Sequence, residues 1–212
     1  MTLYHHPTED RLVDYATGAL AWGARLVVGA HLGACSVCSK AVGEADAVGG
    51  ALLSVMPPVA LKEDALALAL ARIERPSPVV PTVQPAPPGW IEVPGEISRA
   101  AQYHRRWAAP GVWVAPVASG PGAARGYLLG IAAGMSVPRH THRGMELVCV
   151  LKGAYRDGAA LYSPGDFACS DDNVDHRPRI TDDGECVCLV FTQAPLVPRD
   201  WVGRLFQPLV GI

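Results

Sequence analysis

A group of residues near the N-terminus has the types and spacing of a metal site. His31 is followed by Cys35 and Cys38, and His5 and His6 lie about 25 residues upstream. A Cys-x-x-Cys pair at a helix start lets two thiolates approach one ion, and an imidazole four residues earlier can reach the same point. Two thiolates and one imidazole leave a tetrahedral zinc one ligand short. We therefore expect His6, which is closer to the helix that would orient it, as the fourth ligand, with His5 as the alternative.

Two other interpretations apply to the same cysteines. Cys35 and Cys38 could be small buried hydrophobic residues with the histidines on the surface, or a redox-active dithiol, which would need a reactive setting. The upstream histidines complete a Cys2His2 ligand set that suits zinc, so zinc is favoured. The ion would tie a first helix to the next two and would replace part of a small core.

A second group of possible ligands lies in the C-terminal half. His140, His142 and Glu146 share a parity along the chain, so on a strand they would all point into a barrel. His176 follows from a later strand and completes the group. Three imidazoles and a carboxylate at one interior point would be costly without a cation. These residues predict a second metal site, and the alternative is a set of partly exposed polar residues near the barrel mouth.

Three further thiols lie on predicted strands. Cys186 and Cys188 share one face of the last strand, and the simplest interpretation is that both are small buried hydrophobic residues. Oxidation of either thiol is the alternative role. Cys149 has the opposite parity to Glu146, so it is expected to point away from the metal.

The N-terminal third of the chain has the periodicity and punctuation of helices. Apolar side chains on these helices, such as Leu12, Tyr15, Leu66, Leu68 and Leu70, are expected in an intramolecular core. The expected helices run from Thr8 to Gly18 or Gly23, from Leu26 to His31, from Cys35 to Gly49, and from Glu63 to Ile73.

The remainder of the chain predicts a β domain after a linker. Six prolines and no charged residue lie between Pro76 and Pro88, which indicates an extended linker. Beyond it, short β-like runs alternate with glycine and proline: Val112–Val117, Tyr127–Ala132, Glu146–Leu151, Asp166–Ser170 and Glu185–Thr192. The predicted fold class is multi-domain α + β, with a zinc-bound bundle of about four helices over residues 1–75, a linker over 76–89, and an all-β antiparallel barrel over 90–212.

Composition excludes several classes of protein. The chain of 212 residues has a formal net charge of −2, which lacks the basic excess of a protein that binds phosphates. The first residues lack the pattern of a signal peptide, and no apolar run approaches the roughly 20 residues that span a bilayer. We therefore expect a cytoplasmic protein without direct nucleic-acid or membrane partners, in which cysteines serve metal binding rather than disulfides.

The second ligand group resembles the two motifs of the cupin superfamily. The first motif is Gly134-x5-His140-x-His142-x3-Glu146-x6-Gly153. The second begins with Gly158-x5-Pro164 and ends at His176, the only histidine after His142. The resemblance covers about residues 108–195. It implies a small antiparallel jelly roll with a metal held by three histidines and one glutamate.

The helical module resembles the zinc-binding anti-sigma domain. Joined through a linker to a cupin-like domain, it resembles the ChrR family of anti-sigma factors over essentially the whole chain. This resemblance implies a regulator of transcription rather than an enzyme. The N-terminal domain would hold a group IV (ECF) sigma factor in a 1:1 complex, and the C-terminal domain would sense an oxidative signal such as singlet oxygen and bring about release.

The alternative is a cupin metalloenzyme, a dioxygenase or isomerase, with a regulatory helical zinc domain. Many cupins with this ligand set are enzymes that use iron or manganese. Four protein ligands complete a tetrahedral zinc shell, whereas six-coordinate iron, manganese or nickel would keep two open positions. Zinc is the expected metal of the second site as well, and it favours a sensor.

Overall fold

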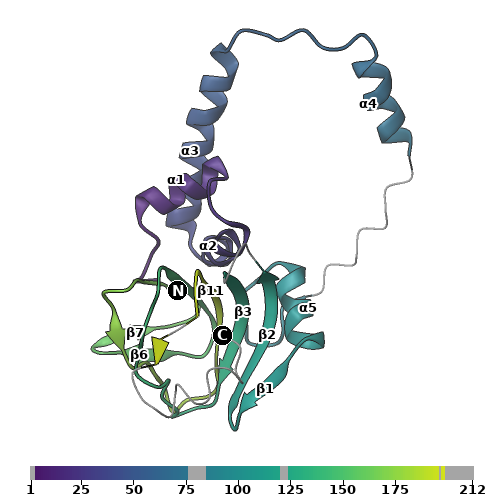
Figure 1. The fold of residues 1–212 in the computed structure, drawn as a ribbon. Coiled ribbons are helices and arrows are strands. Elements are labelled where there is room, and N and C mark those ends of the chain that lie inside the picture. The colour runs from purple at the N-terminus through teal and green to yellow at the C-terminus, as the bar shows by residue number, and fades with distance from the viewer. Residues whose placement is uncertain (1–2, 76–84, 120–123, 196, 199–212) are drawn as a thin grey trace.

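Helices form the first half of the chain. The computed structural model describes residues 3–75, 85–119, 124–195 and 197–198, so most of the predicted linker lies outside the described residues. The four expected helices are present, and a fifth, α5, was not predicted. The helices are α1 (Glu9–Thr17), α2 (Trp22–Ala34), α3 (Ser36–Val55), α4 (Ala65–Glu74) and α5 (Gly95–Tyr103) (Figure 1).

Local chemistry explains the helix ends near the first ligand group. Gly18 ends α1 in the left-handed conformation that glycine adopts without strain, with φ 75°. Cys35 is the extended residue between α2 and α3, and its Sγ accepts a hydrogen bond from the Cys38 N–H at 3.5 Å. The thiol of Cys35 is therefore an N-cap, and it lies where the helix dipole favours negative charge.

Twelve strands in the described residues form three antiparallel sheets. The six-stranded sheet has the order β1 (Arg106–Ala109), β2 (Val112–Ser119), β3 (Arg125–Ile131), β11 (Cys186–Thr192), β5 (Glu146–Lys152), β8 (Phe167–Ser170). The smaller sheets are β10 (Arg179–Ile180), β6 (Tyr155–Asp157), β7 (Ala160–Tyr162), and β12 (Val197–Pro198), β4 (His140–Thr141), β9 (Asp175–His176). The five predicted runs correspond to β2, β3, β5, β8 and β11, and the other described strands, of two to four residues, were not predicted.

The six-stranded sheet is buried on both faces. Alternation along β11 places Leu189 and Phe191 in one cluster with Val27 and Val28 of α2, and Cys188 in a second cluster inside the barrel. The contact between α2 and the sheet is close. A Cβ at Gly23 would lie 2.5 Å from the Phe191 ring. One continuous hydrophobic core therefore joins the helical half to the barrel (Figure 1).

The helix α4 is different from the others. Leu12 of α1 is buried, as expected, but Leu66, Leu68 and Leu70 of α4 are exposed, so the expectation of an intramolecular core was wrong for these three. The structure describes α4 throughout and gives it no buried residue. In Figure 1 it stands apart from α3 and from the barrel.

The helices were also compared with the length and hydropathy of a membrane span. No single helix within the described residues is long and apolar enough to cross a bilayer. Helices α2 and α3 satisfy these criteria only when joined, and the chain bends by 117° between them.

Candidate metal centres

The structure brings the first ligand group together from three elements. His6 precedes α1, His31 lies in the last turn of α2, Cys35 separates α2 from α3, and Cys38 lies in the first turn of α3. His5 is directed elsewhere, because its ring stacks on Tyr162 with a centroid distance of 4.1 Å. We call the four residues His6, His31, Cys35 and Cys38 the helical centre.

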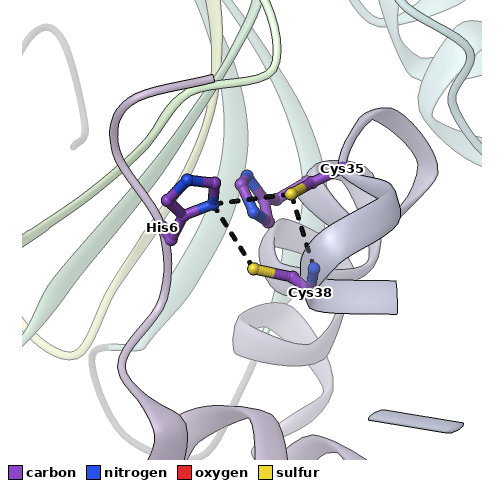
Figure 2. Close-up of side chains that lie close together, drawn as sticks. His6, Cys35 and Cys38 are labelled. Carbon is purple, nitrogen blue, oxygen red and sulfur yellow. Dashed lines mark hydrogen bonds between the residues drawn. The ribbon is translucent and has the colours of Figure 1, made fainter. Parts of the chain in front are cut away.

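The distances within the helical centre match those around a small ion. His6 Nδ1 lies 3.4 Å from Cys35 Sγ and 3.4 Å from Cys38 Sγ (Figure 2). One ligand atom from each of the four residues lies within 4.8 Å of the others. Tetrahedral zinc with ordinary bond lengths separates its ligand atoms by about 3.3–3.8 Å. The group can therefore hold a metal with small adjustments.

The surroundings of His31 also indicate that it is a metal ligand. His31 is fully buried, and its Nδ1–H donates to the Gly165 carbonyl oxygen at 2.7 Å. Its Nε2 has no hydrogen-bond partner among the described residues. A buried polar atom without a partner is costly, and a metal ion would satisfy it. Burial also lowers the pKa of His31, so the imidazole is neutral and ready to bind.

The thiol of Cys38 must lose a proton before it can bind a metal. Burial, together with the neighbouring Cys35 thiol, raises the pKa of Cys38 to about 12. The thiolate is the form that coordinates zinc. Metal binding at the helical centre is therefore coupled to proton release.

The second ligand group converges inside the barrel. His140 begins β4, Glu146 begins β5, and His142 lies in the loop between them, so the three residues do not share one strand as predicted. His176 of β9 pairs directly with His140 across the small sheet. One ligand atom from each residue lies within 4.8 Å of the others. We call these four residues the barrel centre.

In the barrel centre, the outer ring nitrogens are held by hydrogen bonds, while the Nε2 atoms face one another or, for His142, the Glu146 carboxylate. The Nδ1–H groups donate outward, from His140 to the Pro138 carbonyl at 2.8 Å, from His142 to the Asp171 carbonyl at 3.2 Å, and from His176 to the Asp157 carboxylate at 2.6 Å. The Nε2 atoms of His140 and His176 then face each other as lone pairs, 3.0 Å apart. Such an arrangement is repulsive unless a cation lies between them, and so the residues fit a bound metal.

The protonation of the barrel centre follows from its surroundings. Burial lowers the pKa of His140. Burial also acts to lower the pKa of His142, but the Glu146 carboxylate, 3.1 Å from His142 Nε2, outweighs it and leaves that pKa raised. Metal binding at His142 therefore competes with protonation of its imidazole.

A cavity of about 230 Å³ adjoins the barrel centre. Apolar side chains of β3, β5 and β11 line one side, and Tyr155, Tyr162 and Ile180 line the other. The buried Tyr127 hydroxyl, also at the cavity wall, has no hydrogen-bond partner in the described part of the chain.

The remaining thiols lie near this cavity or behind it. Cys186 and Cys188 are buried on the inner face of β11 with their sulfur atoms 3.8 Å apart, and Cys188 lines the cavity. Cys149 is buried on the opposite face of the sheet, which confirms its predicted direction away from the barrel centre.

Sequence reasoning missed the residues that orient the ligands. Gly165, Asp157 and Asp171 accept the outward hydrogen bonds of His31, His176 and His142. Two of these acceptors are backbone carbonyls, which any residue can supply, so the sequence holds no signal for them. Only the Pro164-Gly165 turn of the second motif could have drawn attention to that segment.

These features define a class of protein, in which a helical unit with a His/Cys metal centre is joined to a cupin-like barrel with a His/Glu centre. The family described as the ChrR Cupin-like domain matches residues 95–195. The anti-sigma-E factor ChrR of Cereibacter sphaeroides is 37% identical over the full length of both chains. The solved structure of Rhodobacter sphaeroides SigE in complex with the anti-sigma ChrR matches with a TM-score of 0.76 and 34% identity, covering 91% of this chain and 100% of that chain. The chain belongs to the ChrR family of anti-sigma factors.

Proposed function

We propose that this chain binds a group IV (ECF) sigma factor in a 1:1 complex and releases it in response to an oxidative signal such as singlet oxygen. In this proposal, residues 1–75 hold the sigma factor, residues 76–89 are a linker, and residues 90–212 are the sensor. Membership of an anti-sigma family makes the chain a regulator rather than an enzyme. The same role implies action in the cytoplasm, where transcription takes place, without direct contact with nucleic acid.

The observation that carries this proposal is the exposed apolar surface of α3 and α4. The side chains of Leu53, Met56, Leu66 and Leu68 are 57–71% exposed. Monomeric proteins rarely leave so many large apolar side chains in water on neighbouring segments, and such surfaces mark sites of protein association. An amphipathic helix that lacks a partner within its own chain is suited to a groove on another protein.

The helical centre supports this surface. Its ligands come from the segment before α1 and from α2 and α3, so a bound zinc would fix the three helices relative to one another. Zinc is the ion that two thiolates and two imidazoles suit best. We expect replacement of Cys35 or Cys38 by alanine to loosen this unit and to release the sigma factor.

The barrel centre is the proposed sensor. Zinc there would connect β4, β5 and β9, which belong to two different sheets. The buried thiols of Cys186 and Cys188 and the ligand imidazoles are groups that oxidants modify. Oxidation of a ligand or of a nearby thiol would distort the connection between the sheets, which offers a physical origin for a signal.

Binding of the sigma factor is tested with the full-length chain and a purified group IV sigma factor by size-exclusion chromatography and titration calorimetry. We expect one complex with 1:1 stoichiometry. The substitution Leu68→Asp should weaken binding at least tenfold without changing the melting temperature, because Leu68 is exposed on a helix that has no buried residue in the described structure. Leu161→Asp is the matched control on the barrel surface. Equal affinities of the two variants would contradict the proposed surface, and the absence of any complex would contradict the function.

Sensing is tested separately with a sigma-dependent reporter and a photosensitiser that generates singlet oxygen. His140→Ala and Glu146→Ala should keep the reporter silent in the dark and remove the response to light, because the signal in this proposal is an oxidative change at an assembled barrel centre, which these variants cannot undergo. A full response in variants that have lost the barrel metal would exclude the barrel centre from sensing.

A further inference from the structure

One turn of the barrel contacts the helical centre directly. It consists of residues 163–166, and we call it the 163–166 turn. The Gly165 carbonyl accepts the Nδ1–H of His31, and no other described group contacts that nitrogen through a hydrogen bond. Gly165 has φ 93°, and a Cβ at this position would lie 2.9 Å from Leu3 and 3.0 Å from Ala34. The turn therefore fits tightly between the N-terminal segment and the end of α2.

Asp166 holds the segment that carries His6. Its carboxylate is 2% exposed, and Oδ1 accepts the backbone N–H groups of Tyr4 at 3.0 Å and of His5 at 3.1 Å. Its Oδ2 accepts the N–H of Ser163 at 2.9 Å, which closes the turn. The next residue, Phe167, donates its N–H to the His5 carbonyl at 3.0 Å. The 163–166 turn thus positions two ligands of the helical centre, His31 directly and His6 through the backbone next to it.

The strand β8 connects this turn to the barrel centre. It begins at Phe167, and its last residue, Ser170, pairs with the ligand Glu146 of β5. The following residue, Asp171, offers its carbonyl to the Nδ1–H of His142. Asp166 and the four residues of β8 therefore separate two carbonyls that orient ligands in different metal centres.

We propose that β8 and its two flanking turns form a mechanical link, through which the state of the barrel centre sets the geometry of the helical centre, with Asp166 as the main positioning residue. The inference rests on the proposed function, because it explains how a signal at the barrel reaches the sigma-binding helices. A paired strand transmits displacement well because its hydrogen bonds resist extension. Metal-ligating histidines depend on their outer hydrogen bonds for orientation, and loss of such a bond typically weakens metal binding about 10- to 100-fold.

The positioning role is tested with Co²⁺ as the probe of the full-length, metal-free chain. Of the two ligand groups found among the described residues, the helical centre alone contains cysteines, so it alone is expected to give a thiolate-to-cobalt charge-transfer band. Asp166→Asn keeps the size of the side chain but removes the oxygen that accepts the Ser163 N–H. We expect it to lower the Co²⁺ affinity of the helical centre about 10- to 100-fold. Asp183→Asn, which changes an exposed aspartate of the barrel, is the matched control and should bind Co²⁺ normally.

Gly165→Ala provides an independent variant, because the added Cβ would push the turn away from α2 without changing the Asp166 side chain itself. It should weaken the cobalt band in the same way, with far-ultraviolet circular dichroism confirming that the helices and sheets are retained. Wild-type affinity in both Asp166→Asn and Gly165→Ala would overturn the positioning role.

The link itself is tested by a double-mutant cycle between the two centres. Glu146→Gln, which removes a ligand of the barrel centre, should weaken Co²⁺ binding at the helical centre by a factor of about 2–30, the usual range for coupling between separate sites. In the Asp166→Asn background the same substitution should have no further effect, because the connection is already broken. Additive effects, or no effect of Glu146→Gln after the barrel metal is lost, would overturn the link. None of these measurements uses a sigma factor, so failure of the proposed function would be seen separately, in the binding experiment above.

Discussion

Metal binding at the helical centre should release a proton from Cys38 and none from His31 near neutral pH. Burial and the adjacent Cys35 thiol raise the pKa of Cys38 from 9.0 to about 12, whereas burial lowers the pKa of His31 below 6.5. To hold Cys38 as a thiolate near neutral pH, well below this pKa, costs free energy. The metal–sulfur bond must supply this free energy.

The dependence of metal affinity on pH measures this cost. Each proton released on binding raises the apparent association constant tenfold per pH unit, so Cys38 alone gives a slope of about 1 in a plot of log K against pH. The assay is a titration of the reduced, metal-free chain with Co²⁺ between about pH 6.5 and about pH 8.5, followed at the charge-transfer band. This range lies below the pKa of Cys38 and above that of His31, so His31 adds nothing to the slope, which reports the two thiols of the helical centre.

Two variants separate the contribution of Cys38 from that of other thiols. Cys38→Ser should weaken the charge-transfer band and lower the slope by about 1, because the serine hydroxyl keeps its proton. Cys169→Ala removes an exposed thiol and should leave both quantities unchanged. A slope near zero in the wild type, or an unaltered band in Cys38→Ser, would refute the assignment of Cys38 as a ligand.

Three other predictions concern the barrel and are checked by urea denaturation. Ile97→Ala should lower the free energy of unfolding by about 2–5 kcal/mol, because the fully buried side chain of Ile97 anchors α5. A loss below about 1 kcal/mol would show that α5 is not part of the core. Tyr127→Phe should leave stability unchanged or raise it by up to about 1 kcal/mol, since it removes a buried hydroxyl without a partner among the described residues, and a clear loss would reveal a missing partner. Burial raises the pKa of Tyr127 and of Tyr155 above 10.0, so these tyrosines ionise first in the unfolded chain. The free energy of unfolding should therefore fall as the pH rises above about 10, and it should fall less steeply in Tyr155→Phe. An identical pH profile in that variant would contradict this.

Local patterns explain why much of the architecture could be predicted. Helix α1 ends at Gly18 because glycine adopts the left-handed conformation there, and five strands were long enough to show their alternation. The direction of Cys149 followed from parity along a single strand. The helix α5 was missed because it follows a proline-rich segment, although Ile97 and Ala100 have helical spacing.

Some inferences about the second ligand group were less accurate. The shared parity of His140, His142 and Glu146 suggested one strand, but a loop at His142 and Arg143 separates β4 from β5. The ligands still converge because the chain turns between these strands. The residue types therefore indicated the ligand group, although the backbone differs from the expected one. Alternation alone also left open which face of β11 is the interior.

The sequence by itself determined the residue types of both ligand groups, since thiolates and imidazoles at short spacings restrict the chemistry whatever the fold. Only the tertiary structure decided how the two groups are connected and which apolar side chains stay exposed. Leu68 and Val27 are both apolar residues on helices, yet one lies in water and the other under the sheet, because exposure depends on whether another segment packs against that face. The hydrogen bond between His31 and Gly165 joins residues 134 positions apart, and its acceptor is a backbone carbonyl, a group that every residue carries and that no local pattern can single out.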